Sequence, residues 1–147
     1  MEPKVYIETT IISYLAARPS LDLIVAGHQQ ITHEWWQIAR HNFTTVSSQL
    51  VAREAGAGDP EAAETRLVFL TGLTLLEISE EALTLAQRLL QNQAIPQDFP
   101  EDALHVAVAV VNGIEYLLTW NYKHLANAGM RSKIETTCRE LGYESMF

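Results

Sequence analysis

Val5-Tyr6-Ile7-Glu8-Thr9-Thr10 places a carboxylate and two hydroxyls directly after a short apolar run. Three β-branched or aromatic residues bounded by polar ones predict a short strand that is buried on both faces. Thr9 and Thr10 are suited to cap a helix over residues 11–17, which Pro19 would end, because their oxygens accept hydrogen bonds from backbone N–H groups. The first predicted unit is therefore a buried strand, an acid at its carboxyl end, and a helix.

The same order of short apolar run and capped helix recurs along the chain. Further strands are predicted at residues 43–46, 73–78 and 116–119. Helices are predicted at residues 20–40 (with Gly27 as a candidate break), after Ser47/Ser48, at 60–70, after Ser79 (with Leu83 on its inner face), at 100–112 and at 131–141. Alternating strands and helices indicate a parallel sheet with helices on both faces. We expect the α/β class, as a three-layer α/β/α sandwich around a mainly parallel sheet of four to five strands.

The composition predicts one domain over residues 1–147, since this length suits one hydrophobic core. The 18 acidic and 10 basic residues give a net charge of −8. Such a chain does not bind nucleic acid or an anionic membrane through bulk positive charge. A local acidic site that holds a cation remains compatible with this charge.

The single cysteine, Cys138, excludes an intramolecular disulfide framework and a cysteine-based zinc motif. A reducing, cytoplasmic location is the simplest inference. The N-terminal residues lack the basic and apolar regions of a signal peptide. The longest apolar stretch, residues 103–120, is interrupted by His105 and Glu115 and therefore predicts no membrane span.

Acidic and polar residues are expected to meet at one edge of the predicted sheet. Glu8 and Asn121 follow strands, Asp102 lies in the first turn of a helix, and Glu54 lies on the helix after the second strand. Ligands of open α/β sheets bind beyond the carboxyl ends of the strands, so we expect Asp102 to project toward Glu8. Three carboxylates brought together repel one another unless a divalent cation such as Mg²⁺ neutralises them.

Four segments at these positions resemble, in order, the motifs of PIN domains. They are Tyr6-Ile7-Glu8-Thr9-Thr10, Glu54 in its helix, Asp102 to Ala107, and Tyr116 to Asn121. More narrowly, they resemble the VapC-like toxins of bacterial type II toxin–antitoxin pairs, over nearly the whole chain. The resemblance implies a Mg²⁺- or Mn²⁺-dependent endoribonuclease that acts on RNA, forms a homodimer, and is inhibited by a small antitoxin protein.

The resemblance also assigns roles to individual residues. It implies that Glu8, Glu54 and Asp102 are catalytic metal ligands, and that Thr119 and Asn121 position waters or phosphate oxygens. Glu8 stands where the family usually has Asp, and Asn121 stands where many members have a fourth acid. Relatives usually continue into a fifth strand, which we expect to be shortened or missing near residues 144–147.

Each candidate residue also has a simpler interpretation. Glu8 suits an ordinary cap or ion pair, Asp102 suits the positive end of a helix dipole, and Glu54 alone reads as a surface glutamate. Asn121 equally suits a turn. His105, one turn after Asp102, is expected either to orient a carboxylate or to be a hydrogen-bonded core histidine. At the level of the whole chain, the alternatives are a PIN-like binding module with weak or no catalysis and, less supported, a small-ligand α/β protein.

Trp35-Trp36 and Lys123 complete the set of features that bear on partners. Helical spacing with Ile31 and Ile38 predicts that one tryptophan ring belongs to the core and that the other contacts a protein partner. Base stacking is the alternative interpretation of the pair. Lys123, just past the predicted site, is a candidate contact to an RNA backbone.

Overall fold

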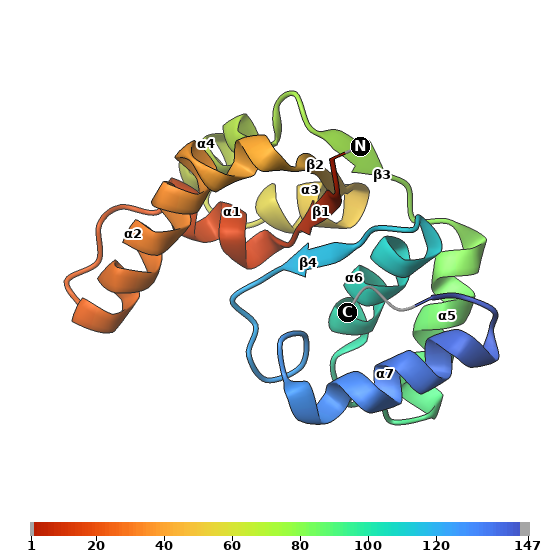
Figure 1. The fold of residues 1–147 in the computed structure, drawn as a ribbon. Coiled ribbons are helices and arrows are strands. Elements are labelled where there is room, and N and C mark those ends of the chain that lie inside the picture. The colour runs from red at the N-terminus through yellow and green to blue at the C-terminus, as the bar shows by residue number, and fades with distance from the viewer. Residues whose placement is uncertain (1, 145–147) are drawn as a thin grey trace.

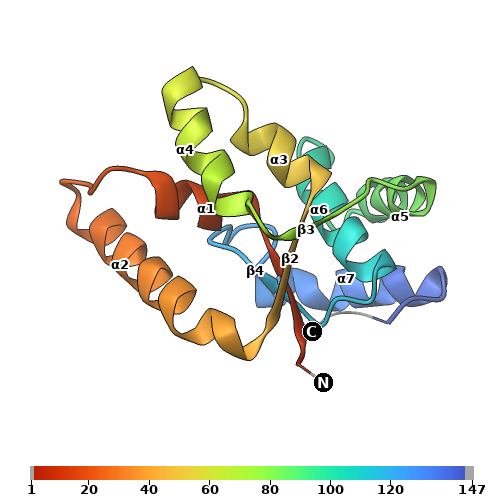
Figure 2. The ribbon, with the colours of Figure 1, turned by 90° about the horizontal axis from the view of Figure 1, so that it is seen from above.

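A sheet of four parallel strands forms the middle layer of the computed structural model, which describes residues 2–144 (Figures 1 and 2). The spatial order is β3-β2-β1-β4, and each neighbouring pair is parallel. The strands are β1 (Lys4–Ile7), β2 (Thr44–Ser48), β3 (Thr74–Leu76) and β4 (Tyr116–Leu118). The predicted α/β class with a parallel sheet is confirmed.

Helices cover both faces of this sheet. They are α1 (Thr9–Ala16), α2 (Leu23–Gln37), α3 (Gln49–Ala55), α4 (Pro60–Leu70), α5 (Glu80–Gln91), α6 (Pro100–Val111) and α7 (Ala128–Glu140), with a short 3₁₀ helix, η1 (Ala39–Asn42). In both ribbon views α1, α2 and α4 lie on one side of the strands, whereas α5, α6 and α7 lie on the other (Figures 1 and 2). The predicted three-layer sandwich is therefore present.

β1 is one of the two interior strands, because it pairs with β2 on one side and with β4 on the other. Val5, Tyr6 and Ile7 are each at most 2% exposed, as expected for a strand buried on both faces. The chain builds β2 and β3 on one side of β1 and then returns to place β4 on the other side. The carboxyl ends of β1 and β4 thus form a topological switch point, where open α/β sheets bind their ligands.

The starts of α1 and α2 differ from the sequence prediction. Glu8 is the N-cap residue of α1, so Thr9 and Thr10 lie inside the first turn instead of capping it. α2 begins after Asp22, whose carboxylate accepts hydrogen bonds from the next backbone N–H groups, and it continues through Gly27 without a break. The Asp22 carboxylate accepts hydrogen bonds from two backbone N–H groups of the first turn and therefore fixes the start of α2. Ser20, the predicted start, lies outside the helix.

The inner face of α2 also differs from the prediction. Ile31 and Ile38 are 56% and 72% exposed, whereas the polar residues Gln29 and Thr32 are buried. Gln29 is satisfied by hydrogen bonds with Ser20 and Arg18. Local polar contacts thus decide which side of the helix faces the protein.

Two helices of the second layer differ in smaller ways. Leu83 of α5 is 47% exposed, and the inner face is formed instead by Ala82, Leu85, Ala86 and Leu89. α7 begins three residues earlier than predicted, because the Asn127 side chain accepts a hydrogen bond from Gly129 N–H and caps it.

The expectation that a fifth strand is shortened or missing near residues 144–147 falls largely on residues 145–147, which lie outside the described residues. Within residues 2–144, no helix has the length and apolar character needed to cross a membrane.

Candidate functional site

Glu8 directly follows β1 at the switch point and is only 5% exposed. Its backbone N–H donates to the carbonyl of Leu118 in β4, which fixes the residue between the two strands. One carboxylate oxygen, Oε1, accepts hydrogen bonds from the hydroxyls of Thr10 (2.6 Å) and Thr119 (2.5 Å). A carboxylate this buried is costly without partners, so the two hydroxyls both stabilise it and set its orientation.

Glu54 lies near the end of α3, the helix that starts at the carboxyl end of β2. Its Oε1 accepts hydrogen bonds from the Thr9 hydroxyl and from His105 Nε2, the latter at 2.8 Å. The side chain is 29% exposed, while that of His105 is 1% exposed. We call this the buried histidine pair, His105–Glu54.

A row of buried hydrogen bonds holds His105 from behind. The Tyr6 hydroxyl lies 2.7 Å from His105 Nδ1 and 2.7 Å from Ser48 Oγ, and Ser48 Oγ accepts from Val51 N–H at the start of α3. If Ser48 donates to Tyr6 and Tyr6 donates to Nδ1, each hydroxyl hydrogen has an acceptor, and Nε2–H is left to donate to Glu54. The core of the sheet therefore orients the Glu54 carboxylate.

Two pKa values respond to this arrangement. Burial acts to raise the pKa of Glu54, but hydrogen bonds from His105 and Thr9 and the charges of His105 and Arg53 outweigh it, so the pKa lies below its ordinary value. Burial raises the pKa of the Tyr6 hydroxyl far above its usual range. Its hydrogen bond with Ser48 opposes this rise, while the charges of Glu8 and Glu54 add to it. Tyr6 is thus a neutral hydroxyl, available to donate to His105.

Asp102 lies in the first turn of α6, where its charge also complements the helix dipole. Its Oδ2 accepts a hydrogen bond from His124 Nδ1 at 2.7 Å, and the ring of Phe99 packs against His124 with centroids 4.1 Å apart. His124 belongs to the loop between β4 and α7 and is 8% exposed. We call this the loop histidine pair, His124–Asp102.

Thr119 and Asn121 connect Glu8 to the loop histidine pair. Thr119 Oγ1 donates to Glu8 and accepts from Asn121 N–H at 2.9 Å. The side-chain oxygen of Asn121 accepts from the backbone N–H of His124 at 3.0 Å. The turn interpretation of Asn121 and its closeness to the site therefore both hold, since the amide shapes the loop that presents His124.

Four of the five predicted residues, Glu8, Thr119, Asn121 and Asp102, are thus connected by hydrogen bonds at the carboxyl edge of the sheet, with His124 as the last link to Asp102. Glu54 is held separately, by His105 and by Thr9, which is the chain neighbour of Glu8. Among residues 2–144, however, no three His, Cys, Asp or Glu side chains are grouped closely enough to hold a metal ion together. Ligation by Glu8, Glu54 and Asp102 stays a prediction.

The donor set nevertheless suits a hard cation. Each of the three carboxylates has one oxygen fixed by neighbouring donors. The second oxygen of each makes no hydrogen bond to the part of the chain that the structure describes. Mg²⁺ is usually bound through one or two carboxylates, water and substrate phosphates, so it does not require a three-residue cage. Oriented carboxylates with a second oxygen left over fit that mode of binding.

Two of the groups that orient the carboxylates, His105 and Thr119, are named by the sequence analysis, and both contact a predicted carboxylate. The others are missed: Thr9 and Thr10 are predicted only to cap a helix, although their position directly after a buried acid is a usable signal. Tyr6 was assigned only to the core, and its hydroxyl gave no separate signal. His124 had none, because its partner Asp102 lies 22 residues away across a helix and a strand.

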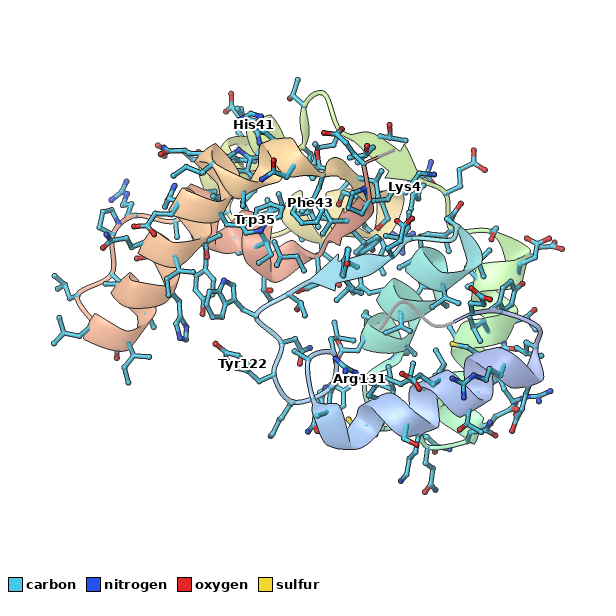
Figure 3. The ribbon with its side chains drawn as sticks, viewed as in Figure 1. Lys4, Trp35, His41, Phe43, Tyr122 and Arg131 are labelled. Atoms are coloured by element: carbon cyan, nitrogen blue, oxygen red, sulfur yellow. The ribbon has the colours of Figure 1, made fainter. Side chains whose placement is uncertain are left out.

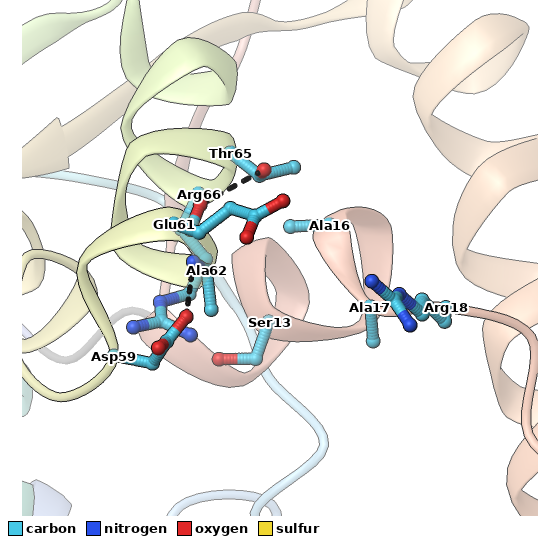
Figure 4. Close-up of a pocket in the computed structure, with 9 residues that line it drawn as sticks. All are labelled: Ser13, Ala16, Ala17, Arg18, Asp59, Glu61, Ala62, Thr65 and Arg66. Carbon is cyan, nitrogen blue, oxygen red and sulfur yellow. Dashed lines mark hydrogen bonds between the residues drawn. The ribbon is translucent and has the colours of Figure 1, made fainter.

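A hollow of about 620 Å³ lies between α1 and α4 (Figure 4). Its lining includes Arg18, Asp59, Glu61 and Arg66, and Arg66 donates to the carbonyls of Ala55 and Ala57. None of the five predicted site residues lines it. The hollow is therefore separate from the carboxyl edge of the sheet.

Comparison with known proteins gives one informative result. No family model and no curated protein matches this chain. A chain in the crystal structure of VapBC2 from Rickettsia felis, bound to a DNA fragment from its promoter, is similar with a TM-score of 0.60 and 19% identity. The match covers 84% of this chain and 91% of that chain. The chain therefore has the VapC-like PIN fold that the four motifs predicted.

Proposed function

We propose that this protein is a divalent-metal-dependent endoribonuclease that hydrolyses RNA phosphodiester bonds and is the toxin of a toxin–antitoxin pair. The observation that carries the proposal is Glu8, a buried carboxylate at the switch point of a PIN-like sheet. Two hydroxyls orient it, and hydrogen bonds connect it to Asp102 through the loop. A buried acid that several polar groups orient by hydrogen bonds suits a binding site better than a structural role.

In this proposal Glu8 and Asp102 hold Mg²⁺ or Mn²⁺, and Glu54 holds a bound water or a second ion. When bound, the ion would supply Lewis acidity for phosphodiester hydrolysis without a covalent enzyme intermediate. Thr119 keeps the Glu8 carboxylate in one rotamer, and His105 does the same for Glu54. Asn121 acts through the loop, because its side-chain oxygen is already used by His124.

The partners form a second part of the proposal. The similar structure is a VapBC2 assembly bound to promoter DNA, which supports an antitoxin partner for this chain as well. Homodimer formation and RNA as the substrate rest on the motif resemblance. A cytoplasmic location follows from the single cysteine, Cys138, and from the proposed substrate.

Cleavage of structured RNA by the purified protein with Mn²⁺ or Mg²⁺, and no cleavage with EDTA, tests the enzymatic proposal. Asp102→Asn should lower the rate at least about 100-fold, because it removes the negative charge of one of the side chains proposed to bind the ion. Glu101→Gln is the matched control, since Glu101 is the exposed neighbour in the same helical turn. Equal rates for the wild type and Asp102→Asn would refute the assigned roles.

A second candidate function is a PIN-like binding module with weak or no catalysis. It is favoured by the lack, among residues 2–144, of a preformed group of three metal-binding side chains. A small-ligand α/β protein is less supported, because the sequence supplies no nucleotide-binding loop or nucleophile for it. Calorimetric titration with Mn²⁺ separates the two leading functions. Binding by the wild type that is lost in Glu8→Ala counts against the binding module.

A further inference from the structure

A hollow with an aromatic lining opens beside the candidate site. It has a volume of about 200 Å³ and lies between α1, α2 and the end of β4. Trp35, Trp120 and Tyr122 line it together with aliphatic side chains from both helices and β4. Thr119 also lines it, and the same Thr119 hydroxyl donates to Glu8. One residue, Thr119, therefore both lines the hollow and holds the carboxylate that the proposed function uses.

The aromatic rings around it are held in fixed positions. Trp120 Nε1–H donates to the Thr32 hydroxyl at 2.7 Å, and the His28 ring stacks on Trp120 with centroids 4.2 Å apart and planes 15° apart. Tyr14 packs edge-on against the same indole. A ring that is hydrogen-bonded and packed in this way offers a rigid apolar surface, which loses little conformational entropy when a ligand binds.

Tyr122 forms the open side of this hollow. It extends from the loop after β4 on the side of α2 (Figure 3), packs edge-on against Trp120, and is 57% exposed. Its ring also meets His28 edge-on, with centroids 6.1 Å apart. An exposed aromatic ring beside a packed indole is the arrangement on which single-stranded nucleic acids stack their bases.

The two threonine hydroxyls in the lining already have hydrogen-bond partners within the protein. Thr32 donates to the His28 carbonyl and accepts from Trp120, while Thr119 donates to Glu8 and accepts from Asn121 N–H. A base in this hollow would therefore find apolar contact and stacking but few groups that read its hydrogen-bonding edge. The volume suits one ring system, since a dry cavity of about 150 Å³ already holds benzene.

We propose that this hollow binds an unpaired base of the RNA substrate, adjacent to the phosphate that is cleaved, without selecting its identity. This inference rests on the proposed ribonuclease function and adds a subsite to it. An RNA base is favoured over a protein side chain because a base necessarily accompanies every phosphate that reaches Glu8. Tyr122 is the residue that contacts the base from the solvent side.

The test compares variants of two tyrosines with similar exposure. Tyr122→Ala should lower kcat/KM on a short single-stranded RNA, and its affinity for that RNA measured by fluorescence anisotropy in Ca²⁺, by about ten-fold, which is typical for loss of one stacked base. Tyr122→Phe should restore both values. Tyr116→Ala, 53% exposed and at the opposite end of β4, should match the wild type.

The second part of the test measures cleavage of abasic RNAs, each of which lacks one base next to the cleaved bond. Removal of the bound base should abolish the difference between Tyr122→Ala and the wild type, whereas exchange of that base for another should change kcat/KM less than about three-fold. The inference is overturned if Tyr122→Ala equals the wild type on intact RNA, or if its defect persists on the abasic RNA. It is also overturned if the variant loses only its affinity for an inhibitory protein. A wild type that cleaves no RNA would instead refute the ribonuclease proposal, and the anisotropy comparison would still report on the base subsite.

Discussion

The two histidine–carboxylate pairs use the same chemical groups but are held by different parts of the fold. The buried pair, His105–Glu54, is backed by Tyr6 of β1 and Ser48 of β2. The loop pair, His124–Asp102, joins the start of α6 to a loop that Asn121 shapes. One carboxylate is thus oriented by residues of the sheet, and the other by the loop between β4 and α7.

This difference suggests a division of labour at the carboxyl edge. A substrate that enters between the pairs would meet Glu54 and Glu8 in positions fixed by β1 and β2. Asp102 is instead oriented from the loop by His124, whose side chain is 10% exposed, whereas that of His105 is 1% exposed. The predictions below test that contrast, first on stability and then on activity.

His105→Leu should give the largest loss of stability. The substitution keeps a side chain of similar volume but removes one hydrogen bond from the Tyr6 hydroxyl, which keeps only Ser48, and one from Glu54, which keeps only Thr9. We expect the free energy of unfolding in urea to fall by about 3 kcal/mol. His124→Leu, measured in the same way, should cost about 1 kcal/mol or less. Equal losses for the two variants would remove the distinction between the pairs.

Tyr6→Phe should have the next largest effect. It leaves Ser48 Oγ and His105 Nδ1 without their shared partner inside the core, so we expect a loss of about 1–3 kcal/mol in the free energy of unfolding. Tyr14→Phe is the control, because the Tyr14 hydroxyl makes no hydrogen bond to any residue that the structure describes, and should change stability by less than about 0.5 kcal/mol. A neutral Tyr6→Phe would show that the buried row of hydrogen bonds does not stabilise the fold.

His124→Gln should affect activity more than stability. The loop pair orients Asp102, and loss of a group that orients a metal ligand typically lowers metal affinity or activity about 10- to 100-fold. We expect a reduction of about ten-fold in the Mn²⁺-supported RNA cleavage rate, with a stability change below about 1 kcal/mol. An unchanged rate would mean that Asp102 does not depend on His124.

The smallest expected effect on stability comes from protonation of the Cys138 thiol. Cys138 lies in α7, the helix that follows the loop. Burial, with a further contribution from the Glu135 charge, raises the pKa of its thiol from 9.0 to about 11. Because the folded state favours the protonated thiol, this contribution to stability is complete below pH 9.0 and is lost as the pH rises toward about 11. At pH 8 a thiol reagent should react with the folded protein only at the rate of unfolding, and fully in urea. Fast reaction would show that movement of the loop extends into α7.

Much of the fold follows from local sequence. Several local signals predicted elements that the structure contains. They are the apolar run Val5–Ile7, the cap residues Ser48 and Ser79, and the start of a helix at Asp59-Pro60. These signals are local, since a cap needs only the N–H groups two or three residues ahead. The inner face of α2 was predicted wrongly, because Gln29 and Thr32 are buried through polar contacts that apolar periodicity does not register.

The candidate site divides in the same way. The carboxylates and Thr119 could be named from motif order, because strand ends and helix starts of a parallel sheet meet at one edge. His105 could also be named as a residue that orients a carboxylate, from its place one turn after Asp102. The roles of Tyr6 and His124 could not, since pairing Tyr6 with His105, or His124 with Asp102, requires the positions of elements far apart in sequence. The exposed Tyr122 was missed as well, because an aromatic residue in a loop has no periodicity to mark it.

The central claim is that Glu8 and Asp102 together bind a divalent ion at the switch point. Calorimetric titration of Mn²⁺ into the wild type, Glu8→Gln, Asp102→Asn and the control Glu115→Gln tests it most directly, because Glu115 is an exposed acid that contacts Lys4 at the opposite end of the sheet. We predict binding by the wild type and Glu115→Gln, and affinity at least about ten-fold weaker in Glu8→Gln and Asp102→Asn. Unchanged affinity in those two variants, or no binding by the wild type, would contradict the claim.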